Sequence, residues 1–235
     1  MTAERIADDQ AAAEHELQAV LARTRLSLAD RILEIGCGWG RHSVALAGRG
    51  YGSVVSIDIA PEPLQLARSV GRQAGLRCHF RQQDFMQVDD GPYGAVLSLY
   101  DRSLCGFPSE AEDLESLRHV AGLLRPSGWL VFGINDWPAA LPEASQQWED
   151  TVEGRELVEV IPDRAAMTCT HRVTLIRADG RRETHALTRR HYSLPELWRL
   201  LTDAGFTPLS AHHRLAEERP YGDGRDGLFI YARRT

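Results

Sequence analysis

The chain has 235 residues, 43% hydrophobic and 26% charged, a composition typical of a soluble globular protein with one sizeable core. Its net charge of −6 argues against nucleic-acid binding, which needs a basic footprint. Four scattered cysteines without a C-x-x-C pair indicate neither a zinc site nor a disulfide framework. There is no signal-peptide pattern and no apolar run long enough to span a membrane. We therefore expect a cytoplasmic protein with no metal and no membrane contact.

The first half of the chain alternates helical and strand patterns with short connections. An alanine-rich segment from about residue 3 to 23 predicts a helix with Leu17, Val20 and Leu21 on one face. Further helices are predicted at 41–48, 63–74 and 110–124, and strands at 31–35, 54–58, 78–82, 95–100 and 129–134. This order predicts an α/β fold, with a parallel sheet that carries helices on both faces.

The pattern changes after Asn135, where strands at 155–161, 167–177 and 181–192 follow a short helix expected near 143–149. Asp179-Gly180 is a hairpin signal between the last two strands. A capping box at residues 193–196 opens a helix that ends at Gly205, and strands follow at 206–212 and 228–233. We therefore divide the chain into a core with an N-terminal lid helix (1–136), an antiparallel insertion that caps the substrate (137–192) and a segment that completes the core (193–235).

The most informative segment is the glycine-rich turn after the first strand. Gly36, Gly38 and Gly40 stand at alternate positions, and a helix begins directly after them. Glycine tolerates positive φ and lets the backbone approach a ligand, and the first amides of a helix lack intrahelical partners. A dinucleotide site usually has the spacing G-x-G-x-x-G. Here Gly40 comes one residue early, which counts against NAD.

Acidic residues follow the next two strands, at the carboxyl ends where open α/β sheets bind ligands. Asp58 ends the strand at 54–58, where a carboxylate can accept hydrogen bonds from both hydroxyls of a ribose. Its alternative role is to cap the helix that follows. Asp84-Phe85 follows the strand at 78–82, and its alternative interpretation is an ordinary loop aspartate beside a core phenylalanine.

The glycine block resembles motif I of the class I S-adenosylmethionine (SAM) methyltransferases, E/D-x-G-x-G-x-G, matched by Glu34, Gly36, Gly38 and Gly40. Residues 124–128 (LRPSG) resemble the family's L-R/K-P-G-G turn, with Ser127 in place of a glycine. Residues 192–205 resemble a segment common in bacterial small-molecule methyltransferases. The resemblance implies a Rossmann-like, seven-stranded and mostly parallel sheet, with SAM as cofactor and S-adenosylhomocysteine (SAH) as product.

The resemblance also implies a cofactor site. Asp84 would bind the adenine amino group, Phe85 would border the adenine ring, and Asp58 would bind the ribose. The other residues that we expect at the cofactor are Glu34, Gly36, Cys37, Gly38, Gly40, Ile59 and Leu99.

The reaction implied is an in-line displacement at the methyl group by a nucleophile of the acceptor, and a base is needed only if that nucleophile is protonated. The candidate bases are Asp101, after the fourth strand, and His191, near which relatives contact their substrates. Tyr100 is expected beside the methyl group, or as a plain lining of the cofactor site. The fourth strand does not end in the N/D-P-P-Y motif of many enzymes acting on DNA bases, RNA or glutamine amides. We therefore expect an N or O nucleophile on a small molecule, such as a secondary metabolite.

Three alternatives remain. The protein acts on RNA or on another protein, which its acidic charge disfavours; it binds SAM without turnover; or it is a NAD(P)-dependent oxidoreductase. The chain contains no lysine, which excludes the Tyr-x-x-x-Lys pair of short-chain dehydrogenases. A homodimer is also possible.

Overall fold

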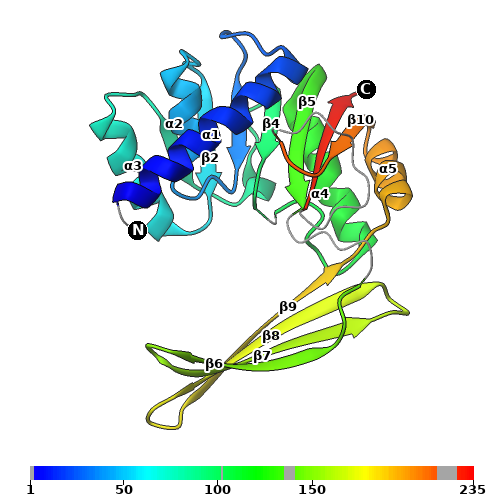
Figure 1. The fold of residues 1–235 in the computed structure, drawn as a ribbon. Helices are drawn as coiled ribbons and strands as arrows, with labels where there is room; N and C mark the ends of the chain where they lie inside the picture. Colours follow the sequence, from blue (N-terminus) through cyan, green and yellow to red (C-terminus); the bar gives the residue numbers. More distant parts are fainter. Residues whose placement is uncertain (1–2, 102, 135–140, 216–226) are drawn as a thin grey trace.

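The computed structural model describes residues 3–101, 103–134, 141–215 and 227–235. They form a seven-stranded sheet flanked by helices and a separate four-stranded sheet that projects from it (Figure 1). The helices are α1 (Ala3–Thr24), α2 (Arg41–Gly48), α3 (Pro61–Gln73), α4 (Glu110–Leu123) and α5 (Leu194–Asp203). The strands of the large sheet are β1 (Ile32–Ile35), β2 (Val54–Asp58), β3 (His79–Gln82), β4 (Tyr93–Ser98), β5 (Leu124–Ile134), β10 (Phe206–His212) and β11 (Leu228–Arg234).

The large sheet has the order β10-β11-β5-β4-β1-β2-β3. Strands β1 to β5 pair in parallel, whereas β11 runs antiparallel to both of its neighbours. The predicted α/β class with a seven-stranded, mostly parallel sheet is therefore confirmed. All residues of β1 and β4 are buried, as expected for strands with helices on both faces.

Two cores lie on the two faces of this sheet. One contains Leu17 and Val20 of α1 and Leu46 of α2, packed against one face. The other contains apolar residues of α4 and α5, packed against the opposite face. The chain therefore leaves β1 toward one face and β4 toward the other, although these strands are neighbours. In open α/β sheets, ligands bind at such a switch point, beyond the carboxyl ends of the strands.

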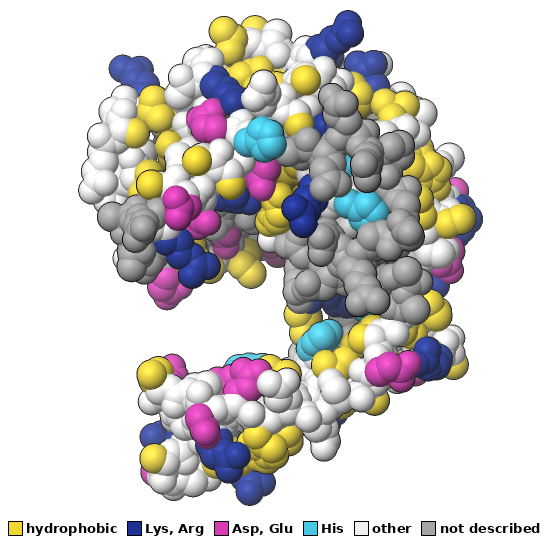
Figure 2. All heavy atoms as spheres, in the orientation of Figure 1, with side chains coloured by type: hydrophobic (Ala, Val, Ile, Leu, Met, Phe, Trp, Pro, Cys, Tyr) yellow, Lys and Arg dark blue, Asp and Glu magenta, His cyan; other side chains and the backbone are white. Residues whose placement is uncertain are grey.

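The four-stranded sheet consists of β6 (Ser145–Thr151), β7 (Gly154–Asp163), β8 (Thr168–Arg177) and β9 (Arg182–Arg190), all antiparallel. It lies beyond the carboxyl ends of the parallel strands, and a wide hollow separates its outer part from the core (Figures 1 and 2). The predicted hairpin is confirmed, since Gly180 has a φ of +82° and Asp179 accepts from the backbone of Arg181.

The short helix predicted near 143–149 is wrong, because this segment is strand β6. Ser145–Thr151 pairs residue by residue with β7 across a tight turn at 152–153. Gly154 permits the turn: its φ is +149°, and a Cβ there would lie 2.2 Å from the carbonyl oxygen of Ile176. Strand pairing therefore outweighs the weak helical pattern of the segment.

The other boundaries shift by a few residues. Helix α3 begins at Pro61, whose missing N–H costs little in the first turn. Strand β4 ends at Ser98, so Leu99 and Tyr100 follow the strand. The capping box of Ser193 and Glu196 is present as predicted. The boundary expected at 136–137 lies outside the described residues, and the three-part division stays a prediction. Among the helices described, none is long and apolar enough to cross a membrane.

Candidate functional site

The glycine turn lies directly beyond the carboxyl end of β1. Gly36, Gly38 and Gly40 have φ values of +64°, +54° and +81°. A Cβ on Gly36 would lie 2.0 Å from an oxygen of Asp101, and one on Gly40 would lie 2.6 Å from the ring of Phe80. A Cβ on Gly38 would meet nothing within 4 Å. Packing therefore requires two of the glycines, while the backbone at Gly38 adjoins open space that a ligand can enter.

Asp58 joins the end of β2 to this turn. Its Oδ2 accepts a hydrogen bond of 2.8 Å from the backbone N–H of Gly38, and its Oδ1 accepts one of 2.9 Å from that of Ala60. The second bond resembles the capping role that we considered as the alternative. A carboxylate has about four acceptor sites, so both oxygens can still accept hydroxyl groups.

A cavity of about 650 Å³ opens beyond these strand ends and reaches the four-stranded sheet. On the core side it is lined by Gly36, Asp58, Ile59, Asp84 and Phe85, five of the residues predicted from the sequence. Phe85 is buried, and Asp84 accepts a hydrogen bond of 3.0 Å from the backbone N–H of Met86. On the opposite side the cavity is lined by Ala186, Leu187, Thr188 and Arg189 of β9. One space therefore combines the predicted cofactor residues with the insertion.

The other predicted cofactor residues lie near this cavity without lining it. Glu34 is buried under the turn, where its carboxylate accepts from Ser43 and contacts His42. Leu99 packs in the core that contains α1. Burial raises the pKa of Cys37, as do the nearby carboxylates of Glu34 and Asp58, so this thiol is neutral at pH 7. Of these side chains, that of Glu34 is tied to the first residues of α2, directly after the turn.

Tyr100 directly follows Leu99 and has a φ of +59°, which is costly for a residue with a side chain. Its hydroxyl donates a hydrogen bond of 2.6 Å to Oε1 of Glu16 in α1. Its ring stacks on His42 at 6.1 Å between centroids and contacts Phe229 edge-on. Burial and the Glu16 carboxylate raise the pKa of Tyr100, so the phenol keeps its proton and cannot act as a base at neutral pH.

Asp101 points back toward the glycine turn. Its Oδ1 accepts hydrogen bonds from the Ser98 hydroxyl at 2.7 Å and from the backbone N–H of Ser103 at 3.2 Å. Its Oδ2 is buried and finds no hydrogen-bond partner in the part of the chain that the structure describes. Burial raises the pKa of Asp101 to about 6. A buried carboxylate oxygen without a partner fits a cationic hydrogen-bond donor beside Gly36.

His191 follows β9 at the base of the four-stranded sheet, where its backbone N–H donates to the carbonyl of Met167 at 2.7 Å. Burial lowers the pKa of His191, and so do the charges of His171 and Arg189, which leaves the imidazole neutral at pH 7. None of the three predicted catalytic residues, Tyr100, Asp101 and His191, lines the cavity. Their predicted catalytic roles therefore stay predictions.

Sequence reasoning missed two features of the site. The first is the stretch of β9 that lines the cavity; its Leu187 is opposite His171 in the sheet register. The second is Glu16, which contacts His42 although the two residues are 26 positions apart in the sequence. No local sequence pattern predicts this contact. Both depend on how distant elements pack, so only the three-dimensional structure reveals them.

Three comparisons relate this chain to known proteins. Residues 32–128 match the family described as "Methyltransferase domain". A ubiquinone biosynthesis O-methyltransferase of Xylella fastidiosa (strain 9a5c) is 32% identical over 145 residues, which cover 54% of this chain and 56% of that protein. The chain thus matches little more than half of this relative's length.

Two of the solved structures with a similar fold match nearly all of the chain. A SAM-dependent methyltransferase from Clostridium acetobutylicum has a TM-score of 0.74 at 15% identity and covers 94% of this chain and 89% of its own. SAM-bound CalS10, an amino pentose methyltransferase from Micromonospora echinaspora, has a TM-score of 0.60 at 21% identity and covers 100% and 98%. At these identities the two structures establish the fold.

Proposed function

We propose that the chain is a class I SAM-dependent methyltransferase, which transfers the methyl group of SAM to an N or O nucleophile of a small molecule. One observation carries the proposal. A single cavity is lined on one side by the residues expected to hold the adenosyl group and on the other by the four-stranded sheet. Such a space suits a cofactor and an acceptor held face to face.

The residues present fit the cofactor. Asp58 has acceptor capacity left for the ribose hydroxyls, and Asp84 with Phe85 offers an acceptor beside an apolar ring for adenine. The unpartnered oxygen of Asp101 fits the ammonium group of the methionine portion. We therefore assign Asp101 to cofactor binding, in place of the base expected from the sequence.

The bound cofactor supplies an activated methyl group on a positively charged sulfur. The protein's own residues then have to align the acceptor, which can contribute up to about 7–11 kcal/mol to lowering a barrier. Leu187 of β9 offers apolar surface to an acceptor, and Arg189 offers a cationic group at the rim of the same cavity. For an acceptor that arrives protonated, we keep His191 as the candidate base, because its imidazole is neutral at pH 7 and it stands two residues after Arg189 of the cavity wall.

Proteins similar to this chain include one named as an O-methyltransferase and one named as an N-methyltransferase. The Xylella relative is a ubiquinone biosynthesis O-methyltransferase, whereas another solved structure of the same fold is the sugar N-methyltransferase KedS8 from Streptoalloteichus. Among the described residues that line the cavity, Arg189 is the one basic side chain, beside apolar residues and the carboxylates of Asp58 and Asp84, and this lining suits a small organic acceptor better than a nucleic acid.

The proposal is tested by incubating the protein with SAM and a panel of small phenols, amino sugars and amines, and by following SAH formation with mass spectrometry of the products. We expect SAH to form only with a methylated small-molecule product. Tight SAM binding with no turnover on any acceptor class would favour a non-catalytic binding protein. Turnover only on RNA or protein would contradict the proposed acceptor class.

A further inference from the structure

A continuous chain of polar side chains connects α1 to the support of the glycine turn. In α1, Glu16 contacts Nε2 of His42 at 2.9 Å through its Oε2, and the opposite ring nitrogen, Nδ1, contacts Oε1 of Glu34 at 3.2 Å. The hydroxyl of Ser43 donates to Glu34 and lies 2.6 Å from that of Ser56. His42, Glu34, Ser43 and Ser56 are all buried. The chain therefore runs from the surface helix to β1 and β2.

The charges of this chain depend on one another. Burial alone lowers the pKa of His42, and Arg41 also lowers it, but the hydrogen bonds to Glu16 and Glu34 raise the pKa overall. Both ring nitrogens then donate, each to a carboxylate, which is the pattern of an imidazolium. His42 lies in the first turn of α2, where the helix dipole disfavours a cation. The two carboxylates are therefore what keeps this ring charged.

Glu16 makes two further contacts at the same place. Its Oε1 accepts from the hydroxyl of Tyr100, and its Oε2 pairs with Arg41 at 3.1 Å. Burial acts to raise the pKa of Glu16, but its hydrogen bonds to His42 and Tyr100 and the charge of Arg41 lower it overall. One carboxylate thus holds residues from α2 and from the segment after β4.

This arrangement accounts for the unusual backbone at Tyr100. A left-handed φ costs about 1–2 kcal/mol for a residue with a side chain, and such a residue persists only where its surroundings hold it. Here the hydroxyl is held by Glu16, and the ring is held between His42 and Phe229 with the Arg41 guanidinium 4.6 Å from its centroid. Removing the Glu16 carboxylate releases the Tyr100 hydroxyl. It also weakens the positive charge on the His42 ring, which stacks against the Tyr100 ring.

We propose that Glu16 is a positioning residue, which holds Tyr100 and His42 together so that the docking of α1 sets the geometry of the glycine turn. The inference rests on the proposed function, because the turn is taken to be the cofactor-binding element. Under this inference, the cofactor site is complete only while α1 is docked against the core. The apolar stripe of Ala13, Leu17 and Val20 seats the helix, and Glu16 transmits its position to the site.

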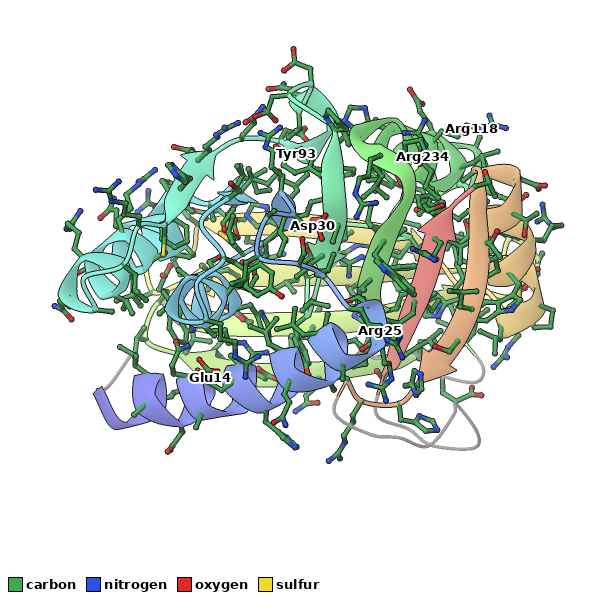
Figure 3. The ribbon with its side chains drawn as sticks, turned by 90° about the horizontal axis from the view of Figure 1, so that it is seen from above. Glu14, Arg25, Asp30, Tyr93, Arg118 and Arg234 are labelled. Atoms are coloured by element: carbon green, nitrogen blue, oxygen red, sulfur yellow. The ribbon has the colours of Figure 1, made fainter. Side chains whose placement is uncertain are left out.

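The experiment compares Glu16→Gln with Glu14→Gln, a matched control on the same helix. Glu14 pairs with Arg49 at 2.8 Å, at the far end of α2 from the glycine turn. Seen from above, α1 runs along one side of the core, with Glu14 on it and Arg25 just beyond its end (Figure 3). Glu14→Gln removes the ion pair with Arg49, directly after α2, whereas Glu16→Gln removes the contacts with Arg41 and His42. Only Glu16→Gln breaks the link to the turn.

Two readouts are measured on the full chain. Calorimetric titration with SAH should show a rise in Kd of at least tenfold for Glu16→Gln and less than twofold for Glu14→Gln. NMR titration of the imidazoles should show a raised pKa of His42 in the wild type, which falls in Glu16→Gln and stays the same in Glu14→Gln. Equal effects of the two variants, or a wild-type SAH affinity and His42 pKa in Glu16→Gln, would overturn the inference.

A third variant tests the same contact independently, in case Glu16→Gln misfolds. Tyr100→Phe removes one hydroxyl from a partly exposed ring, and we expect it to raise the Kd for SAH severalfold, with less than additive effects when the two substitutions are combined. Full additivity, or no effect of Tyr100→Phe, would count against the inference. If the wild type does not bind SAH at all, the proposed function fails, and the pKa of His42 still decides whether Glu16 holds the ring.

Discussion

At the scale of single residues, two aspartates differ in how well their oxygens are satisfied. Both oxygens of Asp58 accept backbone hydrogen bonds, and this residue lines the cavity, whereas Asp101 has one satisfied oxygen and one buried oxygen without a described partner. The first arrangement builds a turn and leaves acceptor sites available. The ionised Asp101 carboxylate is electrostatically unfavourable in its buried position, and a cationic ligand beside it removes this penalty.

Replacing Asp58 with alanine should weaken SAH binding. Hydrogen bonds to a charged group contribute about 1.5–3 kcal/mol, so we expect the Kd to rise about 10- to 100-fold in calorimetric titration. Asp179→Ala is the control, because Asp179 also accepts from a backbone N–H, in an exposed hairpin turn. An unchanged Kd in Asp58→Ala would refute the ribose assignment.

Replacing Asp101 with asparagine should separate stability from binding. The pKa of this carboxyl is raised to about 6 from 3.8, so the folded protein holds the proton more tightly than the unfolded chain. The ionised form therefore destabilises the fold increasingly from about pH 4 to pH 6 and fully above pH 6.

We expect Asp101→Asn to have a higher Tm than the wild type at pH 7 and a similar Tm at pH 4. Its SAH affinity should fall at pH 7, because the charge that meets the ligand's ammonium group is lost. Wild-type affinity should increase as the pH rises through about 6, and that of the variant should not. A parallel pH dependence of the two proteins would argue against this role of Asp101.

At the scale of elements, the glycine turn and the strand ends were predictable because they follow local rules. Alternate glycines after an apolar strand require positive φ, and all three have it. The capping box before α5 is equally local. In contrast, strand β6 was predicted as a helix, because its identity depends on pairing with β7 and on the turn that Gly154 permits. The contact between Glu16 and His42 depends on helix docking and leaves no trace in the sequence pattern.

The two later glycines of the turn should respond differently to alanine. Gly40→Ala drives a Cβ to 2.6 Å from the Phe80 ring, so we expect overpacking to destabilise the fold by about 1–3 kcal/mol, in addition to backbone strain. Gly38→Ala meets no neighbour and should cost only the strain of its φ, about 1–2 kcal/mol. Because its methyl group enters the ligand's space, Gly38→Ala should nevertheless weaken SAH binding strongly. Denaturant unfolding and calorimetry measure the two effects, and stronger SAH binding by Gly38→Ala than by Gly40→Ala would contradict this division.

At the scale of the whole molecule, the core lines one side of the cavity and β9 lines the other, and the four-stranded sheet faces the core across a hollow (Figure 2). We assign residues of the core to binding the adenosyl group and residues of β9 to binding the acceptor. The expected absence of nucleic-acid partners, the possible homodimer and the expected cytoplasmic location stay predictions.

This division predicts that the sheet can be altered without disturbing the cofactor. Leu187→Ala removes apolar surface from the β9 side of the cavity, where Leu187 is 47% exposed. We expect its SAH Kd to stay within twofold of the wild type while the KM for the acceptor rises severalfold. Val152→Ala, at an exposed turn of the same sheet, should change neither value. An increase in the SAH Kd of Leu187→Ala with an unchanged acceptor KM would contradict the assignment of β9.

The central claim is that the glycine turn and the acids at the next strand ends bind an adenosyl ligand. Calorimetric titration of the wild-type protein with SAH, in parallel with NAD⁺, tests it most directly. We predict saturable binding of one SAH per chain and no detectable heat from NAD⁺. Binding of NAD⁺ without any binding of SAH or SAM would contradict the account.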